Sequence, residues 1–189
     1  SCNGPRACYD ESKRLGETMC IVYMQLYNIP VKIVRPFNIY GPGMRLDDYR
    51  VIPNFVANAL KGVPIPVYGD GRNTRTFCYV SDAIAGFFKV LFSDYNGEVF
   101  NVGNQDGEIS MWNLAETVTK LLGNGVQMEK RVGPNETYMS ADPKRRCPDI
   151  TKIKNMIGYT PKIDLRTGLN RFIEWAREEH ESQEKSTTN

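Results

Sequence analysis

Apolar residues recur at three- and four-residue spacing between Glu11 and Tyr27, which predicts an amphipathic helix with one buried stripe. The stripe consists of Leu15, Met19, Val22, Tyr23 and Leu26. Asn28-Ile29-Pro30 ends this helix, and the β-branched run Val31–Val34 is typical of a buried strand. A loop rich in Pro and Gly follows from Arg35 to Gly43. This order of helix, strand and irregular loop predicts an α/β fold.

The other elements are predicted from periodicity together with cap and turn residues. Helices are expected at Ile52–Lys61, Asp82–Phe92, Met111–Leu122, Ile150–Ile157 and Leu165–Glu179, and strands at Ile65–Tyr68, Arg75–Tyr79 and Glu98–Val102. The expected N-caps are Ser81, Ser110, Asp149 and Asp164, and Gly123 and Gly158 are expected to end two helices. The first two of these strands flank the turn Asp70-Gly71 and are candidates for a hairpin. We expect residues 183–189 to form a disordered polar tail.

Composition and charge exclude several classes of protein. The chain has 189 residues, of which 41% are hydrophobic and 24% charged, and its formal net charge is +2, too small a bias for a protein that coats nucleic acid. The longest apolar run, Met19–Met24, is far shorter than the ~20 residues of a membrane span, and the N-terminus has no apolar signal region. We therefore expect neither membrane insertion nor secretion.

The cysteine and histidine content limits the kinds of catalytic and metal site that the chain can hold. The five cysteines include no C-x-x-C pair, which argues against a disulfide framework and a zinc site and fits a reducing, cytoplasmic location. The single histidine, His180, is expected at the surface. Neither a histidine base nor a metal site is expected.

A dinucleotide-binding loop is absent from the sequence. Such a loop needs a strand, a G-x-G-x-x-G segment and a helix in that order, because the pyrophosphate approaches glycine backbone at the helix N-terminus. The glycine-rich segments Gly41-Pro42-Gly43 and Gly69-Asp70-Gly71 are only as long as turns. The helical pattern also begins almost at the first residue, as though the chain starts in the middle of a fold.

Three groups of residues are candidates for chemistry. Tyr9 and Lys13 are four residues apart at the start of a helix, so the ammonium can lower the pKa of the phenol and make it a base. Arg75 follows a turn, and Arg146 lies in the basic run before Asp149; both can bind phosphate. On spacing alone, each group is more often an ordinary set of surface charges.

Taken together, these segments resemble the extended short-chain dehydrogenase/reductases that act on nucleotide sugars. The resemblance rests on residues 4–14, 35–42, 67–71, 74–80, 101–104 and 145–149, in that order, and covers nearly the whole chain. Within that group the sequence looks most like the UDP-glucuronate decarboxylases, with the dTDP-glucose 4,6-dehydratases as the nearest alternative. The resemblance implies that the chain forms the C-terminal part of a Rossmann-like parallel-sheet domain plus a smaller α/β substrate-binding domain.

The resemblance implies a division of the chain and a role for each candidate residue. Residues 1–45 would end the NAD-binding domain, residues 46–180 would mainly bind the nucleotide sugar, and 181–189 would be the tail. Tyr9, Lys13 and Arg75 would be catalytic, and Tyr9, Lys13, Pro36 and Phe37 would contact NAD. The substrate would be bound by Asn38, Arg50, Val51, Val67, Tyr68, Arg75, Arg146 and Asp149. Cys147-Pro148 departs from the usual residues between Arg146 and Asp149, so these two roles are carried over less firmly.

The parent enzyme would decarboxylate UDP-glucuronate to UDP-xylose through a 4-keto sugar. Dehydration or 4-epimerisation of a nucleotide sugar are the alternatives, because the residues that decide among them would lie upstream. An alternative of another class is a truncated, non-catalytic chain that binds a nucleotide sugar weakly or serves only as an interaction surface. We expect the isolated chain to be inactive, to bind NAD weakly at most and to associate through its uncovered apolar surface, with residues 11–27 as the homodimer surface.

Overall fold

The computed structural model describes residue 4 and residues 7–132 and 143–187 of the chain. Its helices are α1 (Ala7–Tyr27), α2 (Val51–Leu60), α3 (Val80–Leu91), α4 (Met111–Leu122), α6 (Thr151–Ile157) and α7 (Leu165–Thr187). Its strands are β1 (Ile33–Pro36), β2 (Ile39–Tyr40), β3 (Ile65–Tyr68), β4 (Thr74–Arg75), β5 (Cys78–Tyr79), β6 (Val99–Val102), β7 (Ile109–Ser110), β8 (Met128–Arg131) and β9 (Arg145–Arg146). The predicted α/β class is confirmed.

The strands pair mainly in parallel. β1 pairs with β6, β2 with β5 and β3 with β8, whereas β4 lies between antiparallel β7 and parallel β9. The expected hairpin is therefore wrong. Gly69 and Gly71, both at positive φ, turn the chain away from β3, and the Trp112 N–H donates to the Gly71 carbonyl, which holds this turn against the start of α4. The strand predicted at Arg75–Tyr79 is likewise two strands, β4 and β5, in different sheets.

Two of the four predicted caps hold at the predicted position. Ser110 Oγ accepts from the Asn113 N–H, and Asp164 Oδ1 accepts from the Thr167 N–H. Helix α6 begins one residue later than expected, so its N-cap is Ile150, and Asp149 before it accepts from the Thr151 N–H through Oδ1 at 2.8 Å. Ser81 does not cap, because α3 already begins at Val80 after an extended Tyr79.

The C-terminal helix is longer than the sequence pattern predicts. α7 continues to Thr187, so the expected disordered tail is wrong for residues 183–187; residues 188 and 189 lie outside the described residues. The chain has neither Gly nor Pro after Gly168, and Glu, Lys and Gln are good helix formers, so nothing breaks the helix. His180, expected at the surface, is half-buried on this helix.

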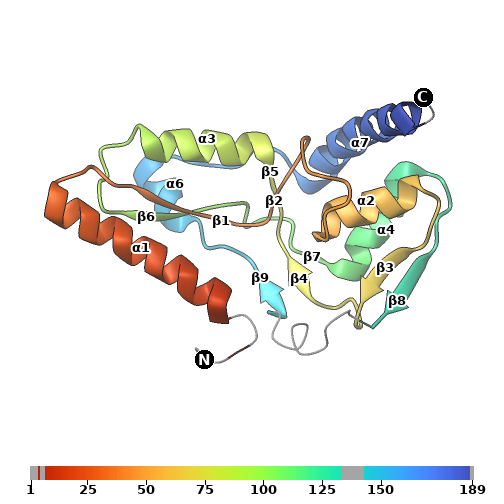
Figure 1. Cartoon of the computed structure of the whole chain (residues 1–189), viewed down its shortest axis with the longest axis horizontal. Helices are drawn as coiled ribbons and strands as arrows, with labels where there is room; N and C mark the ends of the chain where they lie inside the picture. The colour runs from red at the N-terminus through yellow and green to blue at the C-terminus, as the bar shows by residue number, and fades with distance from the viewer. Residues whose placement is uncertain (1–3, 5–6, 133–142, 188–189) are drawn as a thin grey trace.

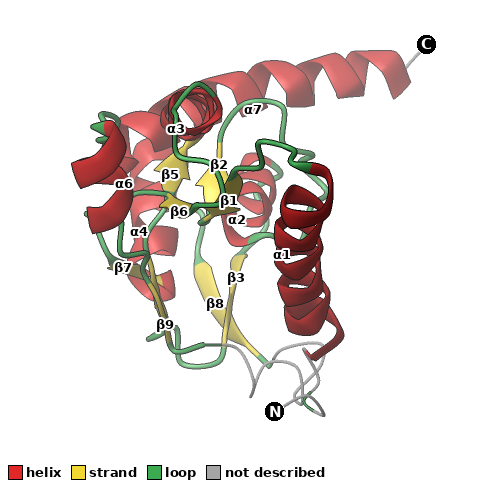
Figure 2. Ribbon diagram, turned by 90° about the vertical axis from the view of Figure 1, so that its left-hand side faces the viewer, coloured by secondary structure: helices red, strands yellow, loops and turns green. Residues whose placement is uncertain are grey.

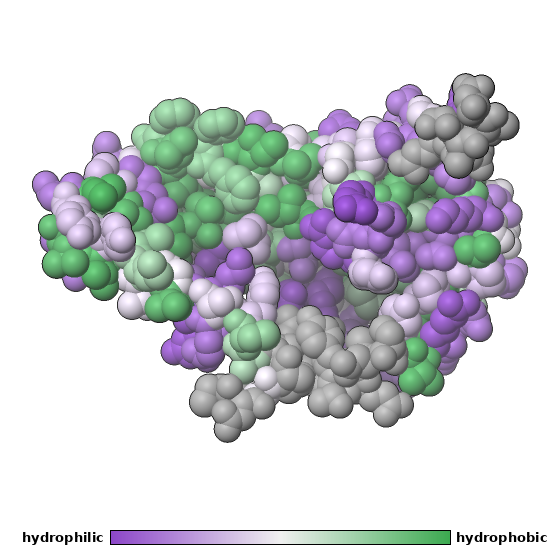
Figure 3. Space-filling model, in the orientation of Figure 1, coloured by the Kyte–Doolittle hydropathy of each residue, from purple (hydrophilic) through white to green (hydrophobic). Residues whose placement is uncertain are grey.

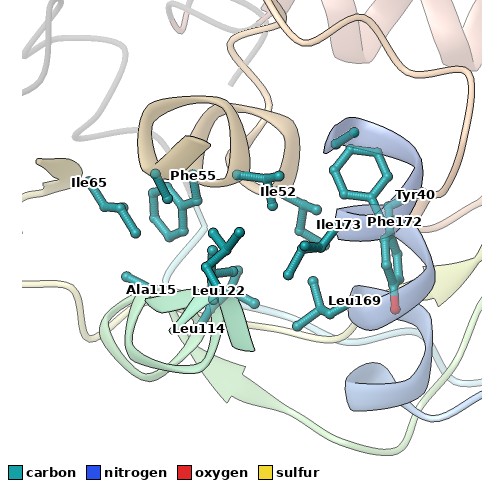
Figure 4. Packing of buried hydrophobic residues seen from close by; sticks show 14 of the residues in the cluster. Tyr40, Ile52, Phe55, Ile65, Leu114, Ala115, Leu122, Leu169, Phe172 and Ile173 are labelled. Carbon is teal, nitrogen blue, oxygen red and sulfur yellow. The ribbon is translucent and has the colours of Figure 1, made fainter. Parts of the chain in front are cut away.

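Two hydrophobic clusters hold the chain together. One joins α2, β3, α4 and α7, and Figure 4 shows Ile65, Leu114, Leu169 and Phe172 within it. The other joins β5, α3, β6 and α6 around Phe100. Figure 1 shows the elements of the first cluster on the right and α1, β1, β6, α3 and α6 on the left. Segments after residue 46 therefore return to the left-hand part, and the division of the chain into two domains stays a prediction.

Helix α1 packs differently from the prediction. Figure 2 shows it beside the rest of the chain, and none of its residues is buried. The expected stripe is exposed, with Leu15 at 59% and Leu26 at 70%, because no described element covers this side of the helix. Figure 3 also shows apolar surface over α3. Phe88 in this helix and Phe92 just after it are both more than half exposed. The amphipathic pattern is correct, but its apolar face is uncovered in this chain.

Candidate functional site

A pocket of about 360 Å³ opens where the loop after β2 and the start of α2 approach β3 and β4. Figure 3 shows a hollow with hydrophilic residues near the middle of this face of the molecule. The residues that line the pocket are Asn38, Ile39, Tyr40, Met44, Tyr49, Arg50, Val51, Ile52, Pro53, Asn54, Phe55, Pro66, Tyr68, Asn73, Arg75, Phe77, Met111 and Arg146. Six of them were predicted as substrate-binding residues: Asn38, Arg50, Val51, Tyr68, Arg75 and Arg146.

Asn38 is fixed at the point where β1 passes into β2. Its φ of 43° lies in the left-handed region, which Asn tolerates better than most residues. Its side-chain Nδ2 donates to the Thr76 carbonyl at 2.7 Å, and its own carbonyl accepts from the Cys78 N–H at 3.1 Å. These bonds hold the strand end that reaches the pocket against the segment joining β4 and β5.

Arg75 and Arg146 come from neighbouring strands. They are register partners in the parallel β4–β9 pair, so their Cα atoms lie side by side. Arg75 is only 8% exposed, and its Nη1 donates to the Thr74 carbonyl at 2.8 Å; Arg146 is half-buried. Two partly desolvated guanidinium groups at one wall form a strong site for a doubly charged anion.

Arg50 supplies a third guanidinium at the start of α2. Asp48 accepts hydrogen bonds from the backbone N–H and the Nε of Arg50, each at 2.8 Å, and Arg50 lowers the pKa of this carboxyl. Among the described residues that line the pocket there is no Asp or Glu. The pocket wall therefore presents three guanidinium groups, and Asp48 outside the pocket pairs with one of them, Arg50.

Aromatic and apolar side chains form the rest of the wall. Tyr68 is 39% exposed and Tyr49 is 96% exposed, so each offers a ring face to a flat ligand. Val67, predicted beside the nucleotide base, is fully buried in the larger cluster and does not line the pocket. Strand alternation explains this, because Tyr68 and Val67 point to opposite faces of β3. Any contact of Val67 with a ligand falls to its backbone.

Tyr9 and Lys13 lie on α1, outside the pocket. Lys13 Nζ is 5.5 Å from the centre of the Tyr9 ring, so the two side chains are neighbours as the four-residue spacing predicts. Tyr9 is 57% exposed. The pair is accessible to a ligand that lies along this side of the helix.

Three other predicted residues do not line the pocket: Pro36, Phe37 and Asp149. Pro36 is exposed and Phe37 half-buried at the end of β1, between α1 and the pocket, and Phe37 donates its backbone N–H to the Val102 carbonyl at 2.9 Å. Asp149 is exposed and does not line the pocket, and its carboxylate caps α6. The predicted role of Asp149 in substrate binding stays a prediction.

Sequence reasoning missed several pocket residues, among them Tyr49, Asn54, Asn73 and Met111. Asn73 follows the predicted turn Asp70-Gly71, and Met111 follows the predicted N-cap Ser110. Local sequence patterns therefore pointed to both positions. Asn54 lines the pocket from the first turn of α2 and is one of two polar residues in this mainly apolar helix, which was the available sign. Tyr49 lies in a loop and gave no sign that separates it from other loop residues.

Two further searches concern metals and membranes. Within residues 7–132 and 143–187, no group of three or more His, Cys, Asp or Glu side chains could hold a metal ion. No helix in the described part of the chain is long and apolar enough to cross a membrane.

Comparison with curated proteins finds close relatives with one named activity. UDP-glucuronic acid decarboxylase 4 of Arabidopsis thaliana is 42% identical over 188 residues, which cover 98% of this chain and 41% of that protein. UDP-glucuronic acid decarboxylase 1 of Xenopus tropicalis is 41% identical and is matched over 95% of this chain and 41% of its own length. The chain thus spans less than half the length of these relatives.

Solved structures and a family model agree with these relatives. An epimerase from Methanothermobacter thermautotrophicus matches with a TM-score of 0.83 and 31% identity over 92% of this chain and 51% of its own. UDP-glucuronic acid 4-epimerase from Bacillus cereus, in complex with UDP-glucuronic acid and NAD, matches with a TM-score of 0.76 and 28% identity over 86% of this chain and 50% of its own. The model of the NAD dependent epimerase/dehydratase family matches residues 1–103. The chain therefore belongs to the NAD dependent epimerase/dehydratase family.

Proposed function

We propose that this chain is the substrate-binding part and active-site helix of an NAD-dependent enzyme that decarboxylates UDP-glucuronate to UDP-xylose. The observation that carries the proposal is the pocket with Arg50, Arg75 and Arg146 and no carboxylate among its described lining residues. Such a wall favours a nucleoside diphosphate, whose two phosphates need bidentate cationic donors. The relatives at 41–42% identity are named as decarboxylases of a substrate of this kind.

The cofactor end of the proposed site lies along α1 and the end of β1. Tyr9, Lys13, Pro36 and Phe37 are accessible there, and they fit the nicotinamide end of NAD rather than its pyrophosphate, for which this chain has no glycine loop. When bound, NAD would supply reversible hydride acceptance from C4 of the sugar. Lys13, whose Nζ lies 5.5 Å from the centre of the Tyr9 ring, would hydrogen-bond the ribose.

The chemistry assigned to the chain is proton transfer and orientation. Tyr9 Oη would take the proton of the sugar 4-hydroxyl as C4 becomes a ketone. The C5 carboxylate is then β to that ketone, so its C–C bond breaks to release carbon dioxide and leaves an enolate at C4 and C5. Protonation at C5, assisted by Arg75, and reduction of C4 would complete UDP-xylose. Asn38 would lie beside the sugar, Tyr68 and the Val67 backbone beside the base, and Arg50, Val51 and Arg146 beside the diphosphate.

Two other reactions of the same family remain candidates. The similarity to the Bacillus cereus 4-epimerase supports epimerisation of a nucleotide sugar at C4. A dTDP-glucose 4,6-dehydratase from Bacillus anthracis, at 30% identity and a TM-score of 0.81 over 95% of this chain and 54% of its own, supports dehydration. A candidate of another class is a chain that only binds or assembles. We further propose a homodimer through the exposed face of α1 and a cytoplasmic location.

The test is an intact mass of the purified protein followed by turnover of UDP-glucuronate with added NAD. The mass of the product separates the reactions, because decarboxylation removes carbon dioxide, dehydration removes water and epimerisation leaves the mass unchanged. Loss of carbon dioxide that disappears in Tyr9→Phe supports the decarboxylase. A product of unchanged mass would replace it with the epimerase. Binding of UDP without turnover by a chain of 189 residues would support the binding piece.

A further inference from the structure

We infer that Glu108 is a positioning residue that sets the register of β4 and β9 and thereby places Arg75 and Arg146 in the pocket. The inference rests on the proposed function, because it concerns the same anion-binding wall. Glu108 itself does not line the pocket and touches no proposed ligand. Its effect passes through two side chains on the other face of the small sheet.

Glu108 joins three strands with one carboxylate. The Thr74 hydroxyl of β4 donates to its Oε1 at 2.5 Å. Arg145 of β9 donates its Nε to Oε1 at 2.9 Å and its Nη2 to Oε2 at 2.8 Å, a bidentate arrangement. Glu108 immediately precedes β7, the antiparallel neighbour of β4. We call Glu108, Thr74 and Arg145 the carboxylate clasp.

The clasp and the pocket occupy opposite faces of the β4–β9 pair. Thr74 is the register partner of Arg145, and Arg75 is the register partner of Arg146. Successive side chains of a strand point to opposite faces, so the clasp residues share one face and the two pocket arginines share the other. The bonds of Glu108 to Thr74 and Arg145 therefore fix the register that places Arg75 and Arg146 on the pocket face.

The backbone alone holds this register weakly. Each of the two strands has only two residues, and the adjoining backbone bonds run from the Thr74 N–H to the Lys144 carbonyl and from the Thr76 N–H to the Arg146 carbonyl, at 2.8 and 3.2 Å. A slip of one residue exchanges the faces of a strand. In the sequence Lys144-Arg145-Arg146, a slip in one direction would place Arg145 at the pocket and Lys144 opposite Glu108, so charge alone does not select the register. Glu108 favours the observed register because the Arg145 guanidinium pairs with both of its oxygens, which a lysine ammonium cannot do in the same way.

The exposure of these groups is consistent with a positioning role. Side-chain exposure is 65% for Arg145 and 28% for Glu108, so the pair adds little to global stability. Arg145 and the Thr74 hydroxyl lower the pKa of the Glu108 carboxyl, which keeps it ionised at neutral pH. The carboxylate clasp therefore acts on the relative position of β4 and β9, which carry the pocket arginines, and not on the stability of the whole fold.

The experiment measures binding of UDP and of uridine to the 189-residue chain by calorimetry. Glu108→Gln should weaken UDP about tenfold and leave uridine nearly unchanged, because only UDP depends on paired guanidinium groups. Arg145→Gln should have the same effect although Arg145 does not line the pocket, and the double variant should lose no more than either single variant. Glu98→Gln is the matched control, since Glu98 pairs with Lys152 at 2.6 Å and neither residue lines the pocket.

A second measurement separates this inference from the proposed function. Cross-strand proton contacts between Thr74 and Arg145 are read by NMR in the ligand-free chain and should be lost in Glu108→Gln but kept in Glu98→Gln. If the wild-type chain binds no UDP, the proposed function fails, and these contacts still decide the role of Glu108. Intact contacts in Glu108→Gln, or an equal loss of UDP affinity in both variants, would overturn the inference.

Discussion

The pocket wall and the active-site helix carry the two halves of the proposed chemistry, and they are built very differently. The pocket lies on a base with a buried core, in which Phe172 and Leu169 are fully enclosed. Helix α1, which carries Tyr9 and Lys13, has no buried residue. The proposed nucleotide site therefore rests on a core within this chain, whereas the apolar face of α1 has no cover among the described residues.

The largest expected effect is on folding. Phe172→Ala should lower the free energy of unfolding by about 3–5 kcal/mol, because it removes a fully buried ring from the cluster in Figure 4. Leu26→Ala on α1 is the matched change, and should cost less than ~0.5 kcal/mol because Leu26 is 70% exposed. Urea unfolding followed by circular dichroism measures both. Equal losses would show that α1 is packed as firmly as the pocket base, for example in a dimer.

The next effect concerns ligand binding. Arg75→Gln should weaken UDP binding by about 30-fold, because it removes a nearly buried guanidinium from the pocket wall. Tyr9→Phe should leave UDP binding unchanged, since Tyr9 lies outside the pocket. Calorimetry with UDP compares the two variants. A large loss in Tyr9→Phe would mean that the two halves of the site are already joined in this chain.

The sequence predicted local structure well where one residue decides the conformation. Ser110 and Gly123 bound a helix at both ends as expected, because a cap needs only the neighbouring backbone. It failed where partners are distant in the chain. The pairing of β3 with β8 and the division of residues 74–79 between two sheets depend on segments that no local pattern identifies.

The candidate site shows the same limit. Spacing predicted that Tyr9 and Lys13 are neighbours, and a turn and a basic run pointed to Arg75 and Arg146, but only the family resemblance gave these residues roles. The amphipathic stripe of α1 was read as buried because periodicity reports which face is apolar and not what covers it. Glu108 gave no signal, since a single carboxylate in a loop acquires its role only when β4 and β9 meet.

Cysteine reactivity compares the two regions without a ligand. Burial raises the pKa of the Cys78 thiol to about 11, so only about one thiol in a thousand is ionised at pH 8, and the thiolate is the reactive form. Cys8 and Cys20 are exposed on α1. Brief treatment with iodoacetamide and peptide mass spectrometry should therefore label Cys8 and Cys20 and leave Cys78 unmodified. Rapid labelling of Cys78 would show that the cluster around Phe100 opens readily.

The smallest expected effect concerns the attachment of α1. Within the described residues, the side-chain hydrogen bonds between α1 and another element are those from Arg35 of β1 to Glu17, with Nε to Oε1 at 2.6 Å and Nη2 to Oε2 at 2.5 Å. Arg35 lowers the pKa of the Glu17 carboxyl, so the pair stabilises the folded state above the unfolded pKa of about 4.3 and is lost as the pH falls through the lower folded value.

Glu17→Gln should therefore reduce protection of the α1 amides at pH 7 by less than ~1 kcal/mol, since both side chains are partly exposed to solvent. Hydrogen exchange followed by mass spectrometry measures this protection, and Glu11→Gln is the control, because Glu11 pairs only loosely with Arg14 on the same helix. Acidification through the lowered folded pKa of Glu17 should remove the difference between wild type and Glu17→Gln. If the variant exchanges like the wild type at pH 7, the ion pair does not hold the helix, and the few apolar contacts around Met24 and Gly97 must do so.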